Sequence, residues 1–242
     1  TKQFPLFDPR CRFTDDTVLT IAVAKALLGD RNYLEMVREL GRRYPDAGYG
    51  GTFIRWLHSD EPKPYNSWGN GAAMRVSPVG FAFETADAVL REAARSAEIS
   101  HNHPEGVKGA QATALSVFLA RKERDKSVIR SEVVDRFGYD LDRTVEAIRP
   151  SYGFDVSCQR TVPQAINAFL DSNSYEDAIR NAISLGGDSD TLACITGGIA
   201  EAFYGSIPLR VLDEVQDRLT ADLWQITEQF CRAYRTLTLN QE

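Results

Sequence analysis

Apolar residues recur at helical spacing in almost every part of this chain, and no other feature narrows its possible folds as far. The first such pattern follows Thr14, a residue type favoured at helix starts, and stops at Gly29, a residue type favoured at helix ends. Almost no segment shows the alternation of apolar and polar residues that marks a half-buried strand. The sequence therefore predicts an all-α fold. Further helices are predicted over residues 33–44, 84–98, 108–121, 131–137, 141–148, 162–171, 175–185, 191–204 and 211–237.

The length and composition of the chain fit one compact helical bundle. Its 242 residues, 43% of them hydrophobic, can bury a full core, and no stretch rich in proline, glycine or serine divides them. We therefore predict a single domain over residues 1–242. A net charge of -6 argues against a general electrostatic attraction to nucleic acid or to anionic lipid. The sequence does not indicate an oligomeric state.

Neither a membrane segment nor a disulfide framework is predicted. The longest apolar stretch, residues 19–28, is interrupted by Lys25 and is about half as long as a bilayer span. The four cysteines lie far apart, without the paired spacing of a zinc site or of a disulfide-rich domain. We expect a cytoplasmic protein, because a reducing compartment suits such thiols.

Two short acidic motifs stand at predicted helix starts. They read Thr-Asp-Asp-Thr at residues 14–17 and Gly-Asp-Ser-Asp-Thr at residues 187–191. One interpretation is helix capping, since Asp and Thr accept hydrogen bonds from free backbone amides and carboxylates are favoured at the positive end of the helix dipole. Capping needs only one such residue, however, whereas each motif supplies two carboxylates and a hydroxyl. The excess favours a second role.

Small residues near the motifs indicate how the motifs could meet. Gly186 and Gly187 allow backbone conformations that other residues avoid, so the chain can turn sharply before the second motif. Small residues in the two following helices would let these helices approach each other closely: Ala22, Ala24, Gly197 and Gly198. We therefore expect the two helix starts to come together.

If the motifs meet, they form a site for divalent cations. Four carboxylates close together repel one another, which raises some of their pKa values and destabilises the fold. A bound cation removes that repulsion. Carboxylate and hydroxyl oxygens without Cys or His favour a hard ion, so the motifs predict Mg²⁺ or Mn²⁺, with enough oxygens for two ions.

Two long connections hold further candidate residues, because long loops in compact domains are commonly functional. Residues 56–71 include Trp68, which would either stack on a ligand ring or belong to the core. Residues 100–106 include His101 and His103. A metal site at these two histidines is disfavoured, because no third nitrogen or thiolate ligand accompanies them.

Four motifs in fixed order extend over nearly the whole chain. They are Arg-Phe-Thr-Asp-Asp-Thr at 12–17, Gly-Asn-Gly-Ala-Ala-Met-Arg at 69–75, Ser-His at 100–101 ahead of Gly-Ala at 109–110, and Gly-Gly-Asp-Ser-Asp-Thr at 186–191. With them the chain resembles the ADP-ribosylglycohydrolases, the family of the dinitrogenase-reductase-activating glycohydrolase. The resemblance implies a compact all-α bundle with a binuclear Mg²⁺ or Mn²⁺ centre.

The resemblance also implies roles for single residues. Residues 69–75 would receive the diphosphate of the substrate, although an ordinary turn there is the alternative. Asp15, Asp16 and Asp190 are expected to act in catalysis. Substrate contacts are expected at Asn70, Gly71, Ala72 and His101. Metal ligands are expected at Thr14, Asp15, Asp16, Asp188, Asp190 and Thr191.

The expected activity is hydrolysis of an ADP-ribosyl N- or O-glycosidic bond in a modified protein or a small ADP-ribose conjugate. Family members carry a Gly-Asp-containing helix and a following acidic residue ahead of the position of Thr1, and we expect the chain to lack this segment. Its absence favours a second hypothesis, a non-catalytic ADP-ribose-binding or structural descendant, whereas the complete set of metal-ligand positions opposes it. A third hypothesis is a metal-dependent hydrolase of a related nucleotide conjugate.

Overall fold

The computed structural model describes residues 1–234, and in that range the chain forms fourteen α-helices and no strand. The predicted all-α class is confirmed. No helix in the described range is long and apolar enough to cross a bilayer. The helices are α1 (Asp15–Leu28), α2 (Tyr33–Arg43), α3 (Gly51–His58), α4 (Gly71–Met74), α5 (Ser77–Ala82), α6 (Ala86–Glu98), α7 (Pro104–Lys122), α8 (Lys126–Phe137), α9 (Val145–Ile148), α10 (Cys158–Leu170), α11 (Tyr175–Ser184), α12 (Ser189–Tyr204), α13 (Leu209–Arg218) and α14 (Ala221–Tyr234).

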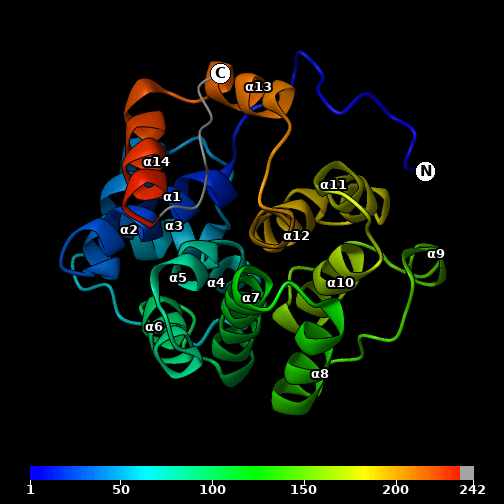
Figure 1. Cartoon of the computed structure of the whole chain (residues 1–242). Helices are drawn as coiled ribbons and strands as arrows, with labels where there is room; N and C mark the ends of the chain where they lie inside the picture. Colours follow the sequence, from blue (N-terminus) through cyan, green and yellow to red (C-terminus); the bar gives the residue numbers. More distant parts are fainter. Residues whose placement is uncertain (235–242) are drawn as a thin grey trace.

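Helix α7 lies at the centre of the bundle (Figure 1). It contacts α4, α5 and α6 on one side and α8, α10 and α12 on the other. Its buried residues, among them Ala110, Leu115 and Val117, are distributed around the whole helix. A helix that is apolar on every side is stable only when other helices enclose it, and this requirement organises the core.

Helices α1 and α12 contact each other and α4, and they carry the two acidic motifs at their starts. The prediction that small residues of α12 face α1 is wrong. A Cβ atom at Gly197 would lie 3.1 Å from Ile179 of α11, and one at Gly198 would lie 2.8 Å from Ser77 of α5. The glycines therefore admit α11 and α5, and the contact between α1 and α12 does not depend on them.

Several helix boundaries differ from the prediction. The segment 211–237 is not one helix, because the chain breaks between α13 and α14, where the Thr220 hydroxyl donates to the Asp222 carboxylate. Residues 235–237 of that predicted helix lie outside the described residues. Only Val145–Ile148 is helical within the predicted 141–148. Helices α3, α4 and α5 were not predicted, since each is too short to show a clear helical period.

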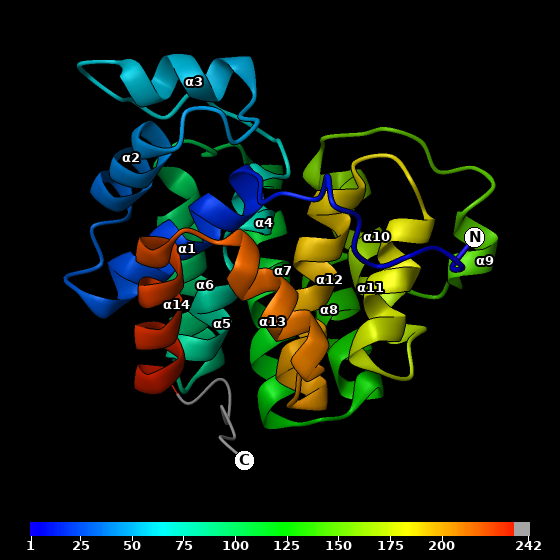
Figure 2. The same cartoon turned by 90° about the horizontal axis from the view of Figure 1, so that it is seen from above.

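Residues 1–14 form an extended segment that passes α11 and leads into α1 (Figure 2). Arg180 of α11 donates to the backbone carbonyls of Lys2 at 3.0 Å and Phe4 at 2.8 Å. The guanidinium of Arg218, on α13, lies 5.4 Å from the ring centroid of Phe7. These contacts define the direction from which the chain enters the first acidic motif.

Candidate functional site

The first acidic motif does not cap its helix with a side chain. Thr14 occupies the cap position of α1 without binding a helix amide, and its hydroxyl donates instead to Oδ2 of Asp16 at 3.1 Å. Asp16 is only 5% exposed, and its Oδ1 has no hydrogen-bond partner among the described residues. A buried carboxylate oxygen without a hydrogen-bond donor is costly, so Oδ1 indicates that a donor or a cation binds at this position.

The second acidic motif is shaped by its backbone. Gly186 and Gly187 have φ values of 76° and 67°, the left-handed conformation that the sequence analysis expected of this pair. Asp188 occupies the cap position of α12 but makes no capping hydrogen bond. Its Oδ2 accepts a hydrogen bond from Nδ2 of Asn70 at 2.7 Å. Neither cap residue, Thr14 or Asp188, therefore caps its helix through its side chain.

The two helix starts lie close enough for their carboxylates to act on one another. Burial, and then the charges of Asp190 and Asp15, raise the pKa of Asp16 to about 7. Burial and the charges of Asp190 and Asp188 raise the pKa of Asp15 to about 6. Burial also raises the pKa of Asp188, as does Asp190, while hydrogen bonds from Asn70 and Thr191 oppose the rise. The predicted convergence of the motifs is thus present.

The donor types fit a hard divalent ion, although the side chains do not form a closed coordination shell. Within residues 1–234, no three acidic, His or Cys side chains are arranged to hold a metal ion as they stand. The fit rests on chemistry: the two starts supply carboxylate and hydroxyl oxygens, which hard ions prefer. It rests also on the unpaired Oδ1 of Asp16, a buried acceptor that a cation would satisfy.

Hydrogen bonds beneath the carboxylates join α1, α4 and α12. The Thr20 hydroxyl lies 2.6 Å from the carbonyl oxygen of Asp16 and 3.2 Å from that of Met74. The thiol of Cys194, on α12, donates to the same Met74 carbonyl at 3.3 Å. Since Met74 ends α4, this short helix links the two longer ones directly below the acidic motifs.

The turn before α4 is tied to the second acidic motif. Nδ2 of Asn70 donates to Thr161 at 3.1 Å as well as to Asp188, and its backbone amide donates to the carbonyl of Val156 at 2.7 Å. The amides of Gly71 and Ala72 donate to no backbone carbonyl outside their own helix in residues 1–234. The turn thus holds Asp188 with Asn70, and the Ala72 side chain is fully buried.

The two histidines of the loop at residues 100–106 are His101, a predicted substrate contact that lies against this turn, and His103. His101 is 5% exposed, and its Nε2 would be 3.1 Å from a Cβ atom at Gly71. Burial and the nearby charge of Arg75 lower the pKa of His101 well below its usual value, so the ring is neutral. Arg75 itself is completely buried and cannot touch a ligand in the turn. His103 accepts a hydrogen bond from the amide of Glu105 at 3.1 Å and caps α7.

An open cavity of about 630 Å³ adjoins the turn. Trp68 and Phe154 line it with side chains that are 48% and 76% exposed, so Trp68 does not belong to the core. An antiparallel bridge between Gly69 and Ser157 joins the two chain segments that form its walls. Two exposed aromatic faces beside the turn that precedes α4 can receive a flat ring of a ligand.

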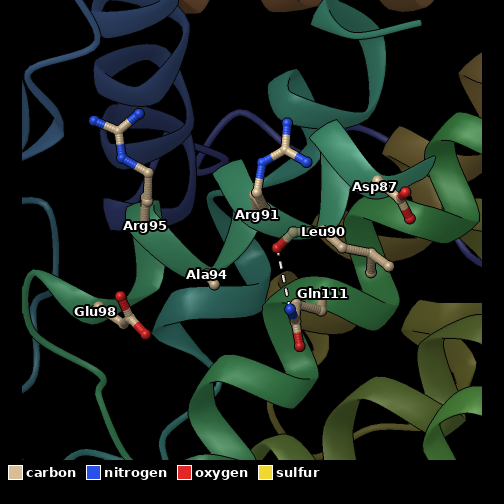
Figure 3. Close-up of a pocket in the computed structure, with 7 residues that line it drawn as sticks. All are labelled: Asp87, Leu90, Arg91, Ala94, Arg95, Glu98 and Gln111. Atoms are coloured by element: carbon tan, nitrogen blue, oxygen red, sulfur yellow. Dashed lines mark hydrogen bonds between the residues drawn. The ribbon is translucent and has the colours of Figure 1, made fainter. Parts of the chain in front are cut away.

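A second cavity, of about 500 Å³, lies between α6 and α7 and does not form a comparable site (Figure 3). Its charged side chains, including Arg91, Arg95 and Glu98, point in different directions. Nε2 of Gln111 is bonded to the carbonyl of Leu90 at 3.1 Å. Because no set of polar atoms converges there, the acidic helix starts are the stronger candidate.

Sequence reasoning missed two tyrosines beside the acidic motifs. The Tyr49 hydroxyl is buried without a partner among the described residues, and the charge of Asp15 contributes to raising its pKa after burial. Tyr152 stands close to Gly187, whose Cβ would lie 3.0 Å from its ring. The sequence signal for Tyr49 was the glycine-rich context of residues 48–51, which marks a loop that other groups approach closely.

Comparison with known proteins places the chain among relatives of known class. A family profile described as ADP-ribosylglycohydrolase matches residues 2–240. ADP-ribosylhydrolase ARH3 of Homo sapiens is 28% identical over 286 residues, which cover 92% of this chain and 75% of that protein. ADP-ribosylarginine hydrolase Tri1 of Pseudomonas putida (strain GB-1) is 29% identical over 162 residues, or 63% of this chain and 42% of that protein.

A solved structure described as an ADP-ribosylglycohydrolase-related protein complex has the same fold. It superposes with a TM-score of 0.72 at 26% identity, and the match covers 92% of this chain and 81% of the other. The family match thus extends over almost the whole chain, including both acidic motifs. The chain belongs to the ADP-ribosylglycohydrolase family.

Proposed function

We propose that the chain is a metal-dependent hydrolase that cleaves an ADP-ribosyl N- or O-glycosidic bond and so removes ADP-ribose from a modified protein or a small conjugate. The observation that carries the proposal is the meeting of two acidic helix starts whose cap residues, Thr14 and Asp188, make no capping hydrogen bond. The similar proteins named ADP-ribosylhydrolase and ADP-ribosylarginine hydrolase support this class of reaction.

The proposed metal ligands are the oxygens of the two helix starts. Their chemistry suits Mg²⁺ or Mn²⁺, and the number of oxygens suits two ions. Two such ions would hold ribose hydroxyls beside the bond to be cut and neutralise the repulsion among the carboxylates. The side chains proposed as ligands are Thr14, Asp15, Asp16, Asp188, Asp190 and Thr191.

Asp15, Asp16 and Asp190 are the proposed catalytic groups. Glycosidic cleavage passes through an oxocarbenium-like transition state in which positive charge develops on the ribose ring. Negative groups that are already held in place stabilise such charge without reorganisation. The packing of α1 against α4 and α12, with the Thr20 and Cys194 bonds below, holds Asp16 in this way.

The rest of the substrate is proposed to lie along the turn at residues 69–75 and in the aromatic cavity. The free amides of Gly71 and Ala72, together with His101, would contact the diphosphate. Trp68 and Phe154 would face the base. For Asn70 the contacts favour an indirect role, because its side-chain amide holds Asp188.

The decisive experiment is an ADP-ribose release assay on arginine-linked, serine-linked and acetyl-linked substrates, with Mg²⁺, with Mn²⁺ and with a chelator. We expect release from at least one substrate, dependent on a divalent ion and abolished by Asp190→Asn. Asp217→Asn, a change at an exposed aspartate of α13, is the matched control and should keep the parental rate. Unchanged release by the Asp190→Asn variant would rule the metal mechanism out. Binding of ADP-ribose without any release would instead support the non-catalytic hypothesis.

A further inference from the structure

A fully buried arginine lies beneath the candidate site and is connected to its histidine. Arg75 directly follows α4 and has no exposed surface. Its Nη2 donates to the carbonyl of Ser96 at 2.9 Å and to the hydroxyl of Ser100 at 3.1 Å. Ser100 Oγ lies 2.8 Å from Nδ1 of His101. Three consecutive hydrogen-bonding groups thus lead from the core to the ring that borders the Gly69–Gly71 turn.

The direction of these hydrogen bonds follows from the donors. A guanidinium can only donate, so the Ser100 oxygen must accept from Arg75. Ser100 is fully buried, and the hydroxyl proton has one acceptor within reach in the described part of the chain, which is Nδ1 of His101. If Nδ1 carried the proton instead, the hydroxyl proton would be buried without a partner. Nδ1 is therefore the acceptor, and the neutral ring carries its proton on Nε2.

The position of Nε2 gives this tautomer a use. Nε2 would be 3.1 Å from a Cβ at Gly71 and 3.6 Å from one at Gly69, and it makes no hydrogen bond to residues 1–234. Since both positions are glycine, the space in front of Nε2 stays open. The Nε2 proton therefore points toward the turn in which the amides of Gly71 and Ala72 donate to no backbone carbonyl outside their own helix in residues 1–234. Burial, and then the charge of Arg75, keep the pKa of His101 well below its usual value, so the ring does not become a cation.

We propose that Arg75 and Ser100 are positioning residues that hold His101 in its Nε2–H tautomer, so that it donates a hydrogen bond to an acceptor oxygen of the substrate diphosphate in the Gly69–Gly71 turn. The identity of that oxygen rests on the proposed function, whereas the tautomer rests on the protein alone. A side chain that merely filled space beside His101 would not determine which ring nitrogen is protonated.

The tautomer can be read directly from long-range ¹H–¹⁵N correlation spectra of the full chain labelled with ¹⁵N-histidine. The chain has three histidines, and His101→Gln identifies the signals of His101. We expect a protonated Nε2 and an unprotonated, hydrogen-bonded Nδ1. Ser100→Ala should convert this pattern to a mixture of the two tautomers or to Nδ1–H. Ser96→Ala is the matched control, because Ser96 is equally buried and its hydroxyl donates to the Ala93 carbonyl, away from His101.

Titration calorimetry with ADP-ribose in the presence of Mn²⁺ gives the second measurement. We expect Ser100→Ala to weaken binding about tenfold, the usual cost of one lost hydrogen bond to a charged oxygen, and Ser96→Ala to leave it unchanged. A wild-type protein that binds ADP-ribose with Nδ1 protonated would overturn this inference and leave the proposed function intact. A tautomer change without loss of affinity would also overturn it. A wild-type protein that does not bind ADP-ribose would count against the proposed function and remove the role of His101 with it.

Discussion

The start of α1 and the start of α12 present the same residue types to one region, but they differ in what surrounds them. At α1, Asp16 is 5% exposed and one of its oxygens has no partner among the described residues. At α12, Asp190 is exposed, and the Asp188 carboxylate is held by Asn70. The carboxylate of Asp16 at the first start is buried, whereas the carboxylates at the second start lie nearer to solvent. Two glycines in the left-handed conformation precede the second start and determine the direction of its backbone.

This difference separates two requirements of a cation site. The cost of crowded negative charge falls mainly on α1, because Asp16 is only 5% exposed, whereas hydrogen bonds from Asn70 and Thr191 oppose the rise in the pKa of Asp188. The direction in which carboxylates are presented is determined mainly at α12, where the backbone turn precedes Asp188. A change at α1 should therefore act through electrostatics, and a change at α12 through geometry.

The largest expected effect is on activity, and both starts should show it. Asp16→Asn and Asp188→Asn each remove one proposed metal ligand, and we expect each to lower ADP-ribose release about 100-fold or more. Their stabilities should differ, since the Asp16 carboxylate is 5% exposed with one oxygen lacking a partner among the described residues, whereas the Asp188 carboxylate is partly exposed and accepts a hydrogen bond from Asn70. Without divalent ions at pH 8, Asp16→Asn should unfold at a higher urea concentration than the parent, and Asp188→Asn should not. If either variant released ADP-ribose at the parental rate, the two helix starts would not both supply metal ligands that the reaction needs.

The next effect tests geometry at α12 with two neighbouring glycines. A Cβ at Gly187 would lie 2.8 Å from the carbonyl of Gly153, whereas one at Gly186 meets no atom within 4 Å. Both substitutions to alanine incur the strain of a positive φ, but only one adds a backbone clash. We expect losses in the free energy of unfolding of about 3 kcal/mol for Gly187→Ala and about 1 kcal/mol for Gly186→Ala. Equal losses in urea unfolding would contradict the role of the close contact.

The sequence predicted those parts of the site that depend on local structure. Helical spacing located α1 and α12, and the pair Gly186 and Gly187 correctly predicted the sharp turn. Each of these features is determined by residues within a few positions of one another, so periodicity and backbone preference were sufficient.

The parts that were missed depend on contacts between distant segments. The bond from Asn70 to Asp188 joins residues 118 positions apart, and no motif in a single sequence reports it. Gly197 was assigned to the contact with α1 because small residues indicate close packing, but they do not indicate which neighbour packs there. Tyr49 was missed for the same reason, since its approach to Asp15 exists only after α1 and the loop at 44–50 are folded together.

A smaller effect concerns pH and isolates the buried charge at α1. Folding raises the pKa of Asp15 to about 6 and of Asp16 to about 7, above the unfolded value of about 3.9. The folded state therefore binds protons that the unfolded state releases, so this contribution to stability is complete below about pH 4 and is lost as the pH rises through 6 and 7. Without divalent ions, the free energy of unfolding should fall by about 2 kcal/mol between pH 6 and pH 8. Asp16→Asn should remove most of that fall. If the free energy of unfolding of this variant fell with pH as steeply as that of the parent, a group other than Asp16 would be responsible.

The smallest effect is expected from the hydrogen bond that Asp16 receives from Thr14. The hydroxyl donates to Oδ2 at 3.1 Å and lowers the pKa of Asp16, because a donor favours the charged carboxylate. Thr14→Val keeps the shape and removes the donor, so it should cost about 1 kcal/mol at pH 8, measured without divalent ions. At pH 6, where the carboxyl is largely protonated, the cost should be smaller. Thr14→Ser keeps the hydroxyl and serves as the control. An equal cost at both pH values would mean that Thr14 contributes by packing, and that its hydroxyl does not stabilise the charged form of Asp16.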